Sequence, residues 1–258
     1  MRLDGTVALV TGASDGIGQC VATRFAARGA RVLVHGRDPD RTRAVADDVG
    51  GAPLIADLAS PAGRARLVSQ ATEEFGRVDV LVNNAGIGWS GPLTDMSVDG
   101  IRTLIGVDLL APIELSRALL PAMVERRSGA VCFVSSVAGR AGVAGEAVYS
   151  AAKAALDTFA ESLRAEATGS GVHVGVVVPG AVSTRFFEKR GRPYGRERPK
   201  PVPPGAVADA VVRSVADNKA EVWVPRWLRI APTVRTLAPS VYRTLAPRFG
   251  EHIRLGPP

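Results

Sequence analysis

The stretch VALVTGASDGIG, residues 7–18, decides the fold of this 258-residue chain. An apolar, β-branched run ends at Thr11, the glycines Gly12, Gly16 and Gly18 follow, and a helical pattern then continues to about Arg28. Glycines let a backbone approach a phosphate closely, and a helix N-terminus offers free N–H groups and a positive dipole. In a strand–turn–helix this arrangement predicts a phosphate-binding turn; the alternative is a glycine-rich turn without a ligand.

Strand and helix patterns alternate through the first two-thirds of the chain. Apolar, β-branched runs occur at Val7–Thr11, Arg31–His35, Pro53–Ile55, Val78–Asn83, Ala130–Ser135 and Val172–Val178. With helical patterns between them, they predict an α/β fold, a doubly wound parallel sheet with helices on both faces. Such sheets bind ligands beyond the carboxyl ends of their strands. A helix is expected at Pro204–Asp217 and a last strand at Glu221–Val224, so that residues 1–224 form one domain.

Composition excludes several classes of protein. Hydrophobic residues make up 46% and charged residues 22% of the chain, which excludes a largely disordered protein. Cys20 and Cys132 lie in apolar segments without a CxxC pattern, so we expect buried thiols, no metal site and a reducing compartment. The N-terminus does not read as a secretory signal, and no run reaches the roughly 18 apolar residues of a membrane span. We therefore expect a cytoplasmic protein.

The net charge of +7 is concentrated in two late segments. Residues 185–203 and 223–258 each carry a net charge of +5, whereas residues 1–184 carry −2. Charge alone would allow a nucleic-acid binder, but nothing in the body of the chain supports one, and no nucleic-acid partner is expected. Residues 185–204, rich in Arg, Lys, Pro and Gly, predict a lid loop.

Residues 225–258 form a basic amphipathic C-terminal extension. An apolar stripe recurs at spacings of three or four, and Pro232, Pro239 and Pro247 should break it into short helices. The stripe comprises Trp227, Ile230, Val234, Leu237, Val241 and Leu245; the other faces carry Arg226, Arg229, Arg235, Arg243 and Arg248, with Glu251 as the only acid. Either the stripe packs on the body or on a neighbouring subunit, which we favour, or the extension contacts an anionic membrane peripherally.

The sequence YSAAK, Tyr149–Lys153, suggests acid/base chemistry. A free phenol has a pKa of about 10, and a lysine four residues on shares its helix face. The ammonium would lower the phenol pKa and suit it to moving a proton on or off an alcohol oxygen. Alone, the pair would more often be a solvated surface pair.

Five motifs in order carry a resemblance to a known family. They are TGASDGIG, NNAG at Asn83–Gly86, SSVAG at Ser135–Gly139, YSAAK, and PGAVST at Pro179–Thr184. Over roughly residues 5–225 the chain resembles the short-chain dehydrogenase/reductase family. The resemblance implies a Rossmann-like fold and an NAD(P)-dependent oxidoreductase that interconverts a carbonyl and a secondary alcohol.

The resemblance also implies the residues of the site. Tyr149 would be the catalytic acid/base, Lys153 would bind the nicotinamide ribose, and Ser136 would bind the substrate oxygen, with Ser135 a structural neighbour. Asp108 occupies the position of the family's usual relay asparagine, and it either serves the relay in altered form or is structural. The cofactor would lie on Gly12, Asp15, Ile17 and Gly18 (pyrophosphate), Asp57 and Leu58 (adenine), Asn83, Asn84, Ala85 and Gly86 (end of the fourth strand), and Pro179, Gly180 and Thr184 (nicotinamide).

The end of the second strand bears on the choice of cofactor. An acid near this point would read the ribose hydroxyl of NAD, whereas an arginine accommodates a 2′-phosphate. Gly36 supplies no acid and Arg37 follows it, so NADP(H) is favoured over NAD(H). Asp15 and Asp38 argue in the other direction, because a carboxylate does not help to bind phosphate.

Substrate and assembly are inferred from less regular segments. Trp89, Val143, Ala144, Phe186 and Phe187 should lie around the substrate opening and favour a mainly apolar carbonyl or alcohol, unless they serve lid packing. The resemblance implies a homo-oligomer through the helix at Tyr149–Thr168, with an apolar side of Ala152, Leu156, Phe159 and Leu163. The main alternative function is a non-catalytic cofactor-binding or interaction protein on the same fold, which Asp108 keeps open; a nucleotide-sugar epimerase or dehydratase would need a longer chain.

Overall fold

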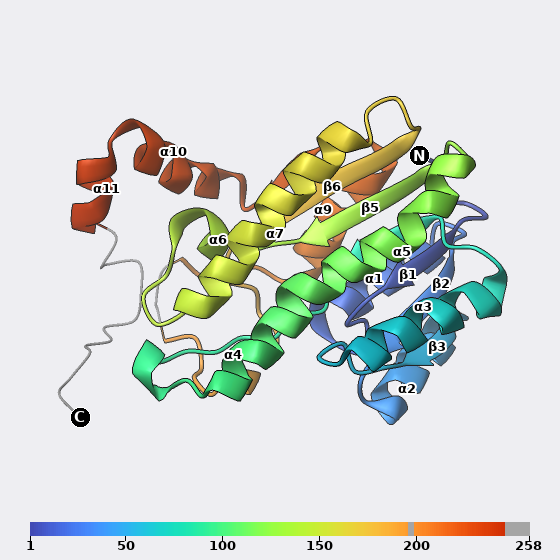
Figure 1. The fold of residues 1–258 in the computed structure, drawn as a ribbon, viewed down its shortest axis with the longest axis horizontal. Helices are drawn as coiled ribbons and strands as arrows, with labels where there is room; N and C mark the ends of the chain where they lie inside the picture. Colours follow the sequence, from blue (N-terminus) through green and yellow to red (C-terminus); the bar gives the residue numbers. More distant parts are fainter. Residues whose placement is uncertain (196–198, 246–258) are drawn as a thin grey trace.

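The computed structural model describes residues 1–195 and 199–245, and its centre is a seven-stranded parallel sheet (Figure 1). The strand order is β3-β2-β1-β4-β5-β6-β7. The strands are β1 (Val7–Val10), β2 (Arg31–Gly36), β3 (Ala52–Ile55), β4 (Val80–Asn83), β5 (Gly129–Val134), β6 (Val172–Pro179) and β7 (Glu221–Val224). β1, β4 and β5 are buried throughout, as expected of strands covered on both faces. The predicted doubly wound sheet is confirmed.

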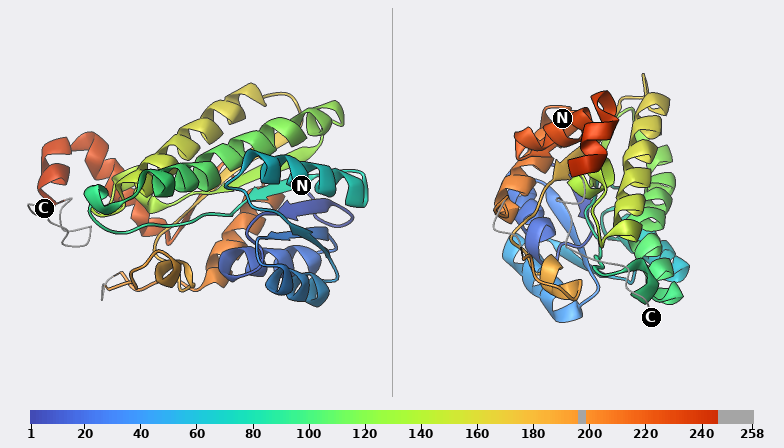
Figure 2. Two further views of the ribbon diagram at one scale, coloured as in Figure 1. Left: turned by 60° about the horizontal axis from the view of Figure 1, so that its bottom comes forward. Right: turned by 90° about the vertical axis from the view of Figure 1, so that its left-hand side faces the viewer.

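Helices cover the sheet in two layers (Figure 2). One layer holds α3 (Pro61–Phe75), α4 (Val98–Ile105), α5 (Ala111–Glu125) and α7 (Ala147–Glu166); the other holds α1 (Gly16–Ala26), α2 (Pro39–Val49) and α9 (Pro204–Ala216). Because successive side chains of a strand point to opposite faces, the central strands contribute to both cores. Leu81 and Phe133 join the core beneath the first layer, whereas Val82 and Cys132 join the core beneath the second.

The loops after β1 and β4 meet where the strand order reverses. β1 pairs with both β2 and β4, so the chain leaves β1 toward one edge and later returns to build the other. The side chain of Asn84 donates hydrogen bonds to the carbonyls of Thr11 and Gly12 at 2.9 and 3.1 Å, and its backbone N–H donates to the Thr11 hydroxyl at 2.9 Å. In doubly wound folds this crevice is where ligands bind.

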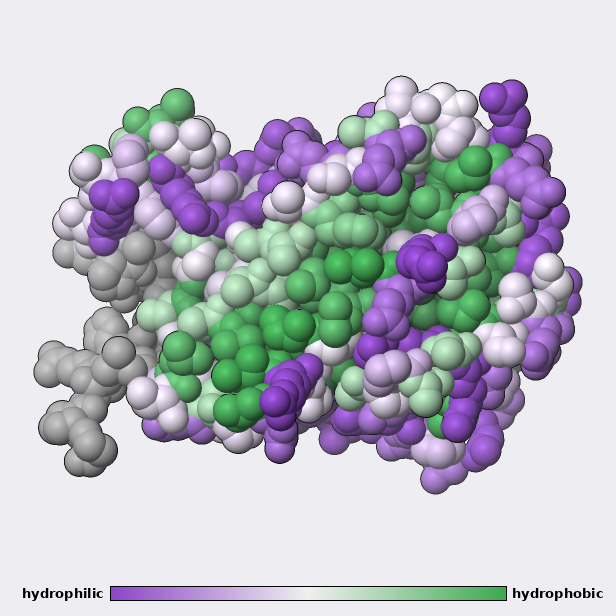
Figure 3. Space-filling view, viewed as in Figure 1, coloured by the Kyte–Doolittle hydropathy of each residue, from purple (hydrophilic) through white to green (hydrophobic). Residues whose placement is uncertain are grey.

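The expected apolar side of α7 faces the chain's own core. Ala152, Leu156 and Leu163 are buried, and Phe159 is half-buried against Phe133. Ala152, Leu156 and Leu163 therefore cannot form a subunit interface, and for these three residues the sequence-based prediction was wrong: sequence periodicity shows which face of a helix is apolar, not what covers it. The exposed face of α7 includes Ala151 and Ala155. Figure 3 shows apolar surface across α4, α5 and α7, where Leu110 and Val124 are about 40% exposed.

The segment predicted as a lid contains a short helix, α8 (Phe186–Lys189). The two ends of the segment are joined to each other by a bridge between Val182 and Val202, and within it the Tyr194 hydroxyl donates to the carbonyl of Pro199 at 2.7 Å. Residues 196–198 lie outside the described residues. The segment thus folds back over the carboxyl end of the sheet instead of extending from it.

The chain beyond β7 forms η3 (Arg226–Arg229), α10 (Ile230–Leu237) and α11 (Pro239–Leu245). The helices break at Ala238, as the following proline predicts, while Pro232 fits in the first turn of α10, where no N–H is needed. The expected packing of the whole stripe on the body is not observed, because most of its described side chains are exposed. Pro247, Arg248 and Glu251 lie outside the described residues. No helix of the described ranges is long and apolar enough to cross a membrane.

Candidate active site

Two adjoining cavities open at the carboxyl ends of the strands. One, of about 250 Å³, lies over the β1–α1 turn; the other, of about 260 Å³, lies between α7, α6 (Val137–Ala141) and the segment after β6. Both are lined by Ile17, Asn84, Gly86, Thr184 and Phe186. A ligand with two parts could therefore occupy both at once.

The first cavity fits a dinucleotide phosphate. A Cβ on Gly18 would lie 2.2 Å from the carbonyl oxygen of Gly12, and one on Gly12, which has φ +64°, would lie 2.8 Å from the Cα of Ala85. Only glycine allows this packing of the turn. Asp15 is the N-cap of α1, yet its side chain makes no capping hydrogen bond, so the first-turn N–H groups are left for a ligand.

His35 holds this turn in place and was not singled out from the sequence. Burial lowers the pKa of His35 to about 4, so its ring is neutral at physiological pH. Nδ1 accepts a hydrogen bond from the Gly12 N–H at 3.2 Å, which leaves Nε2 to donate to the carbonyl of Ala56 at 3.1 Å. The imidazole therefore connects the phosphate turn to the end of β3.

The far end of the first cavity is basic. A Cβ at Gly36 would lie 2.1 Å from the Thr42 hydroxyl, so this position cannot carry an acidic side chain without a shift. Arg37 and Arg41 line the cavity. Asp38, which also lines it, is engaged in capping α2: it accepts from the backbone N–H of Arg41 at 3.1 Å and from its Nε at 2.8 Å.

Asp15 is surrounded by cations that the sequence alone did not place there. Its Oδ2 lies 3.2 Å from Nζ of Lys189, on the lid helix, and 3.8 Å from Nη1 of Arg41. The negative charge of Asp15 that weighed against a 2′-phosphate is thereby paired with Lys189, while Arg41 is shared between Asp15 and Asp38. Asp57 and Leu58 line the same cavity, as the resemblance implied.

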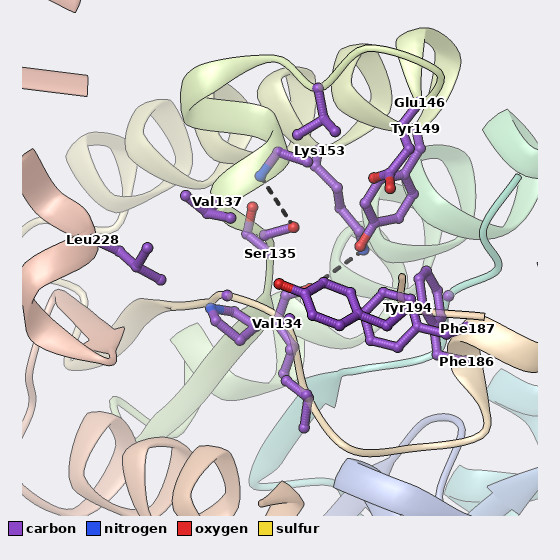
Figure 4. Close-up of a pocket in the computed structure, with 18 of the residues that line it drawn as sticks. Val134, Ser135, Val137, Glu146, Tyr149, Lys153, Phe186, Phe187, Tyr194 and Leu228 are labelled. Atoms are coloured by element: carbon purple, nitrogen blue, oxygen red, sulfur yellow. Dashed lines mark hydrogen bonds between the residues drawn. The ribbon is translucent and has the colours of Figure 1, made fainter. Parts of the chain in front are cut away.

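The second cavity brings Ser136, Tyr149 and Lys153 together. Figure 4 shows Tyr149 and Lys153 in this cavity. Tyr149 and Lys153 project from α7 toward the end of β5, and the Lys153 ammonium lies 5.7 Å from the Tyr149 ring centre and 3.3 Å from the carbonyl oxygen of Val134. Ser136 is the N-cap of α6, and its hydroxyl accepts from the Ala138 N–H at 3.1 Å. Phe186, Phe187 and Tyr194 face them across the cavity.

Asp108 lies behind this cluster in η2 (Gly106–Leu110), a π-helical turn between α4 and α5. Its fully buried carboxylate accepts from the backbone N–H of Ile87 at 2.8 Å and lies 3.3 Å from Nζ of Lys153. Gly86 permits this approach, because a Cβ there would be 3.0 Å from Oδ2 of Asp108. π-helical turns often mark functional sites, and this one aims a carboxylate at the lysine.

The electrostatics of Tyr149 differ from the sequence-based prediction. Burial raises the pKa of Tyr149 above its ordinary value, and the Asp108 carboxylate raises this pKa further. A hydrogen bond with Ser136 acts in the opposite direction without reversing the shift. The net lowering expected from Lys153 is not seen here: burial and the Asp108 carboxylate, whose Oδ2 lies 3.3 Å from the Lys153 ammonium, raise the pKa of Tyr149 instead. Tyr149 is a protonated acid at neutral pH.

Most predicted site residues line the two cavities. Gly12, Asp15, Arg37, Asp57, Leu58 and Ala85 line the first, Ser136, Tyr149, Lys153, Pro179 and Gly180 line the second, and Ile17, Asn84, Gly86 and Thr184 line both. Gly18 and Asp108 lie behind them, and Asn83 is buried with its Nδ2 3.4 Å from the Ser116 hydroxyl.

The predicted substrate opening is partly correct. Val143, Phe186 and Phe187 line the second cavity, whereas Trp89 and Ala144 do not. Trp89 instead packs with the cluster around Met96 and Leu104. Residues not identified from the sequence also line the cavity, namely Glu146, Arg190, Tyr194, Trp227 and Leu228.

Comparison with known proteins identifies the family. Residues 6–194 match the short chain dehydrogenase family. The chain belongs to this family. It is 37% identical to the ketoacyl reductase HetN of Nostoc over 86% of this chain and 79% of that protein, and 39% identical to the 3-oxoacyl-[acyl-carrier-protein] reductase FabG of Escherichia coli over 71% and 76%. A short-chain dehydrogenase from Sphingobium yanoikuyae, solved in complex with NADPH, superposes with a TM-score of 0.81 at 31% identity, covering 93% of each chain.

Membership in the short-chain dehydrogenase family fixes the general activity. The protein is an NAD(P)-dependent oxidoreductase of the type that includes ketoacyl reductases. Its Rossmann-like sheet and the two cavities provide the frame for that chemistry.

Proposed function

We propose that this oxidoreductase reduces an apolar ketone to a secondary alcohol with NADPH, through Tyr149, Ser136 and Lys153. The observation that carries this proposal is the meeting of Tyr149, Ser136 and Lys153 in a cavity that adjoins the one over the phosphate turn. The raised pKa of Tyr149 agrees with a role as proton donor. A phenol that stays protonated at neutral pH is poised to donate a proton to a carbonyl oxygen, whereas oxidation of an alcohol would need the phenolate.

The residues of the second cavity have different roles in the proposed reaction. Tyr149 donates its proton to the substrate oxygen while the Ser136 hydroxyl holds that oxygen by a hydrogen bond. The nicotinamide, when bound, supplies the hydride that joins the carbonyl carbon, so that hydride and proton together convert C=O to CH–OH. Lys153, whose Nζ lies 3.3 Å from Oδ2 of Asp108, would bind the nicotinamide ribose.

The first cavity is proposed to hold NADP(H). The pyrophosphate would lie at the N-terminus of α1, on the turn from Gly12 to Gly18, where close packing excludes side chains. Arg37 and Arg41 would bind the 2′-phosphate, since Gly36 offers no carboxylate to a ribose hydroxyl. Asp57 and Leu58 would contact the adenine.

The second cavity supports an apolar substrate. Much of its lining is aliphatic or aromatic and comes from three stretches of the chain: Val134, Val137, Val143, Phe186, Phe187, Tyr194, Trp227 and Leu228. The charged Arg190 and Glu146 in the lining pair with each other. We further propose that the enzyme is a homo-oligomer that associates through the exposed faces of α5 and α7.

A panel of ketones and alcohols, each assayed with NADPH, NADH and their oxidised forms, tests this function. We expect NADPH-dependent ketone reduction that Tyr149→Phe lowers by about 10²–10⁴-fold, the usual contribution of a general acid. Thr158→Ala, which removes an exposed hydroxyl from the same helix outside the two cavities, is the control and should leave turnover unchanged. Near-native turnover of Tyr149→Phe would reject the assigned acid.

A further inference from the structure

The chain beyond β7 presents an apolar and basic surface, here termed the tail surface. It consists of the exposed apolar side chains of Trp227, Ile230, Leu237 and Val241, together with Arg226, Arg229 and Arg243. Leu237 is 80% and Ile230 is 63% exposed, values unusual for large aliphatic side chains. Figure 1 shows α10 and α11 projecting from one end of the molecule, and Figure 3 shows apolar side chains at their outer edge with hydrophilic ones beside them.

The tail surface is exposed although the segment is anchored. Leu228 is buried and lies close to Gly180, and the hydroxyl of buried Tyr242 donates to the carbonyl of Ala141. Nη1 of Arg235 donates to the carbonyl of Arg140 at 3.0 Å. Leu228, Arg235 and Tyr242 thus hold the segment against the body, while the residues of the tail surface point outward. An exposed apolar patch of this kind marks an interaction site.

The positive charge of residues 225–245 favours an anionic partner for the tail surface. Residues 225–245 contain four arginines and no acidic residue. A symmetric contact with a second copy would bring the same arginines together, and like charges across an interface are unfavourable. An anionic lipid surface satisfies both properties, because apolar side chains enter the boundary of the acyl region and each arginine gains about 1 kcal/mol near the headgroups.

The tail surface adjoins the mouth of the substrate cavity. Trp227 is 53% exposed and also lines that cavity, and the neighbouring Leu228 lines it from within (Figure 4). We propose that the tail surface docks on an anionic membrane and that the cavity takes its apolar carbonyl substrate from the lipid phase. The substrate half of this inference rests on the proposed ketone reduction; the docking half does not.

Vesicle co-sedimentation of the full chain tests the docking. The full chain should bind vesicles of equal parts phosphatidylcholine and phosphatidylglycerol, less at high salt, and should bind pure phosphatidylcholine weakly. Arg229→Gln with Arg243→Gln should lower the partition coefficient about 25-fold, fivefold for each arginine. Leu237→Ser should lower it as well. The matched control, Arg66→Gln with Arg213→Gln on α3 and α9, removes two exposed arginines elsewhere and should bind like the native chain.

Three outcomes overturn the docking. Absence of salt-sensitive vesicle binding by the full chain, or equal loss in the control variant, would remove the membrane as the partner. Self-association without vesicles that Leu237→Ser abolishes would assign the tail surface to a second copy instead.

Turnover separates this inference from the proposed function. A long-chain alkan-2-one dissolved in the anionic vesicles should be reduced more slowly by the Arg229/Arg243 variant, while a water-soluble ketone should be reduced at the native rate. If neither ketone is reduced but vesicles are bound, the proposed function fails and docking stands. If the soluble ketone is reduced but vesicle-dissolved ketone is reduced equally by both forms, delivery from the membrane fails alone.

Discussion

The buried pair of Asp108 and Lys153 should behave as one energetic unit. Their charged atoms lie 3.3 Å apart, with side chains 0% and 4% exposed. At an effective dielectric constant of about 20, that separation corresponds to about 5 kcal/mol of attraction, opposed by the desolvation of both charges. Asp108→Asn or Lys153→Met alone should each lower the free energy of unfolding by about 3–5 kcal/mol, because each leaves one buried charge without its partner.

The double variant should cost much less than the sum of the two, since replacing a buried ion pair by uncharged groups is often nearly neutral. Urea unfolding of the four proteins measures this coupling. Asp99→Asn is the control, because it breaks an exposed ion pair with Arg102. The side chain of Asp99 is 89% exposed and that of Arg102 is 75% exposed, so the free energy of unfolding should change little. Single-variant effects that simply add would refute the pair as a unit.

Further predictions concern catalysis, cofactor and assembly. Asp108→Asn should retain or raise the rate of ketone reduction. It should also move the alkaline loss of activity to lower pH, because the Asp108 carboxylate raises the pKa of Tyr149 and reduction needs the protonated phenol. An unchanged pH profile would contradict this. Arg37→Ala should weaken NADPH binding about 10- to 100-fold and NADH binding far less, measured by titration; equal losses would indicate that Arg37 does not bind the 2′-phosphate. Ala155→Arg, on the exposed face of α7, should shift the chain toward monomers in light scattering, and a native chain that is monomeric at micromolar concentration would reject the oligomer.

Local patterns accounted for most of the fold. The strand runs at Val7–Thr11 and Val172–Val178 ended within a residue or so of β1 and β6, because burial on both faces demands continuous apolar sequence. The positions of motif residues such as Asn84 and Thr184 in the cavity could also be predicted, because the carboxyl ends of parallel strands meet at one edge of the sheet.

What depended on contacts between distant segments could not be predicted. The ion pair of Lys189 with Asp15 joins residues far apart in the chain, and no local pattern indicates it. Trp227 was assigned to an amphipathic stripe, but whether it lines the cavity depends on how the segment after β7 packs. The direction of the pKa shift of Tyr149 required its burial and the position of Asp108, neither of which a YxxxK spacing contains.

Transfer of label from cofactor to substrate tests the central claim most directly. NADPH deuterated at the transferring C4 position is incubated with the enzyme and an apolar ketone, and the product is analysed by mass spectrometry. The account predicts a secondary alcohol with one deuterium on the carbinol carbon, and almost none from Tyr149→Phe. Cofactor binding without labelled alcohol, across ketones that fit the cavity of about 260 Å³, would contradict it.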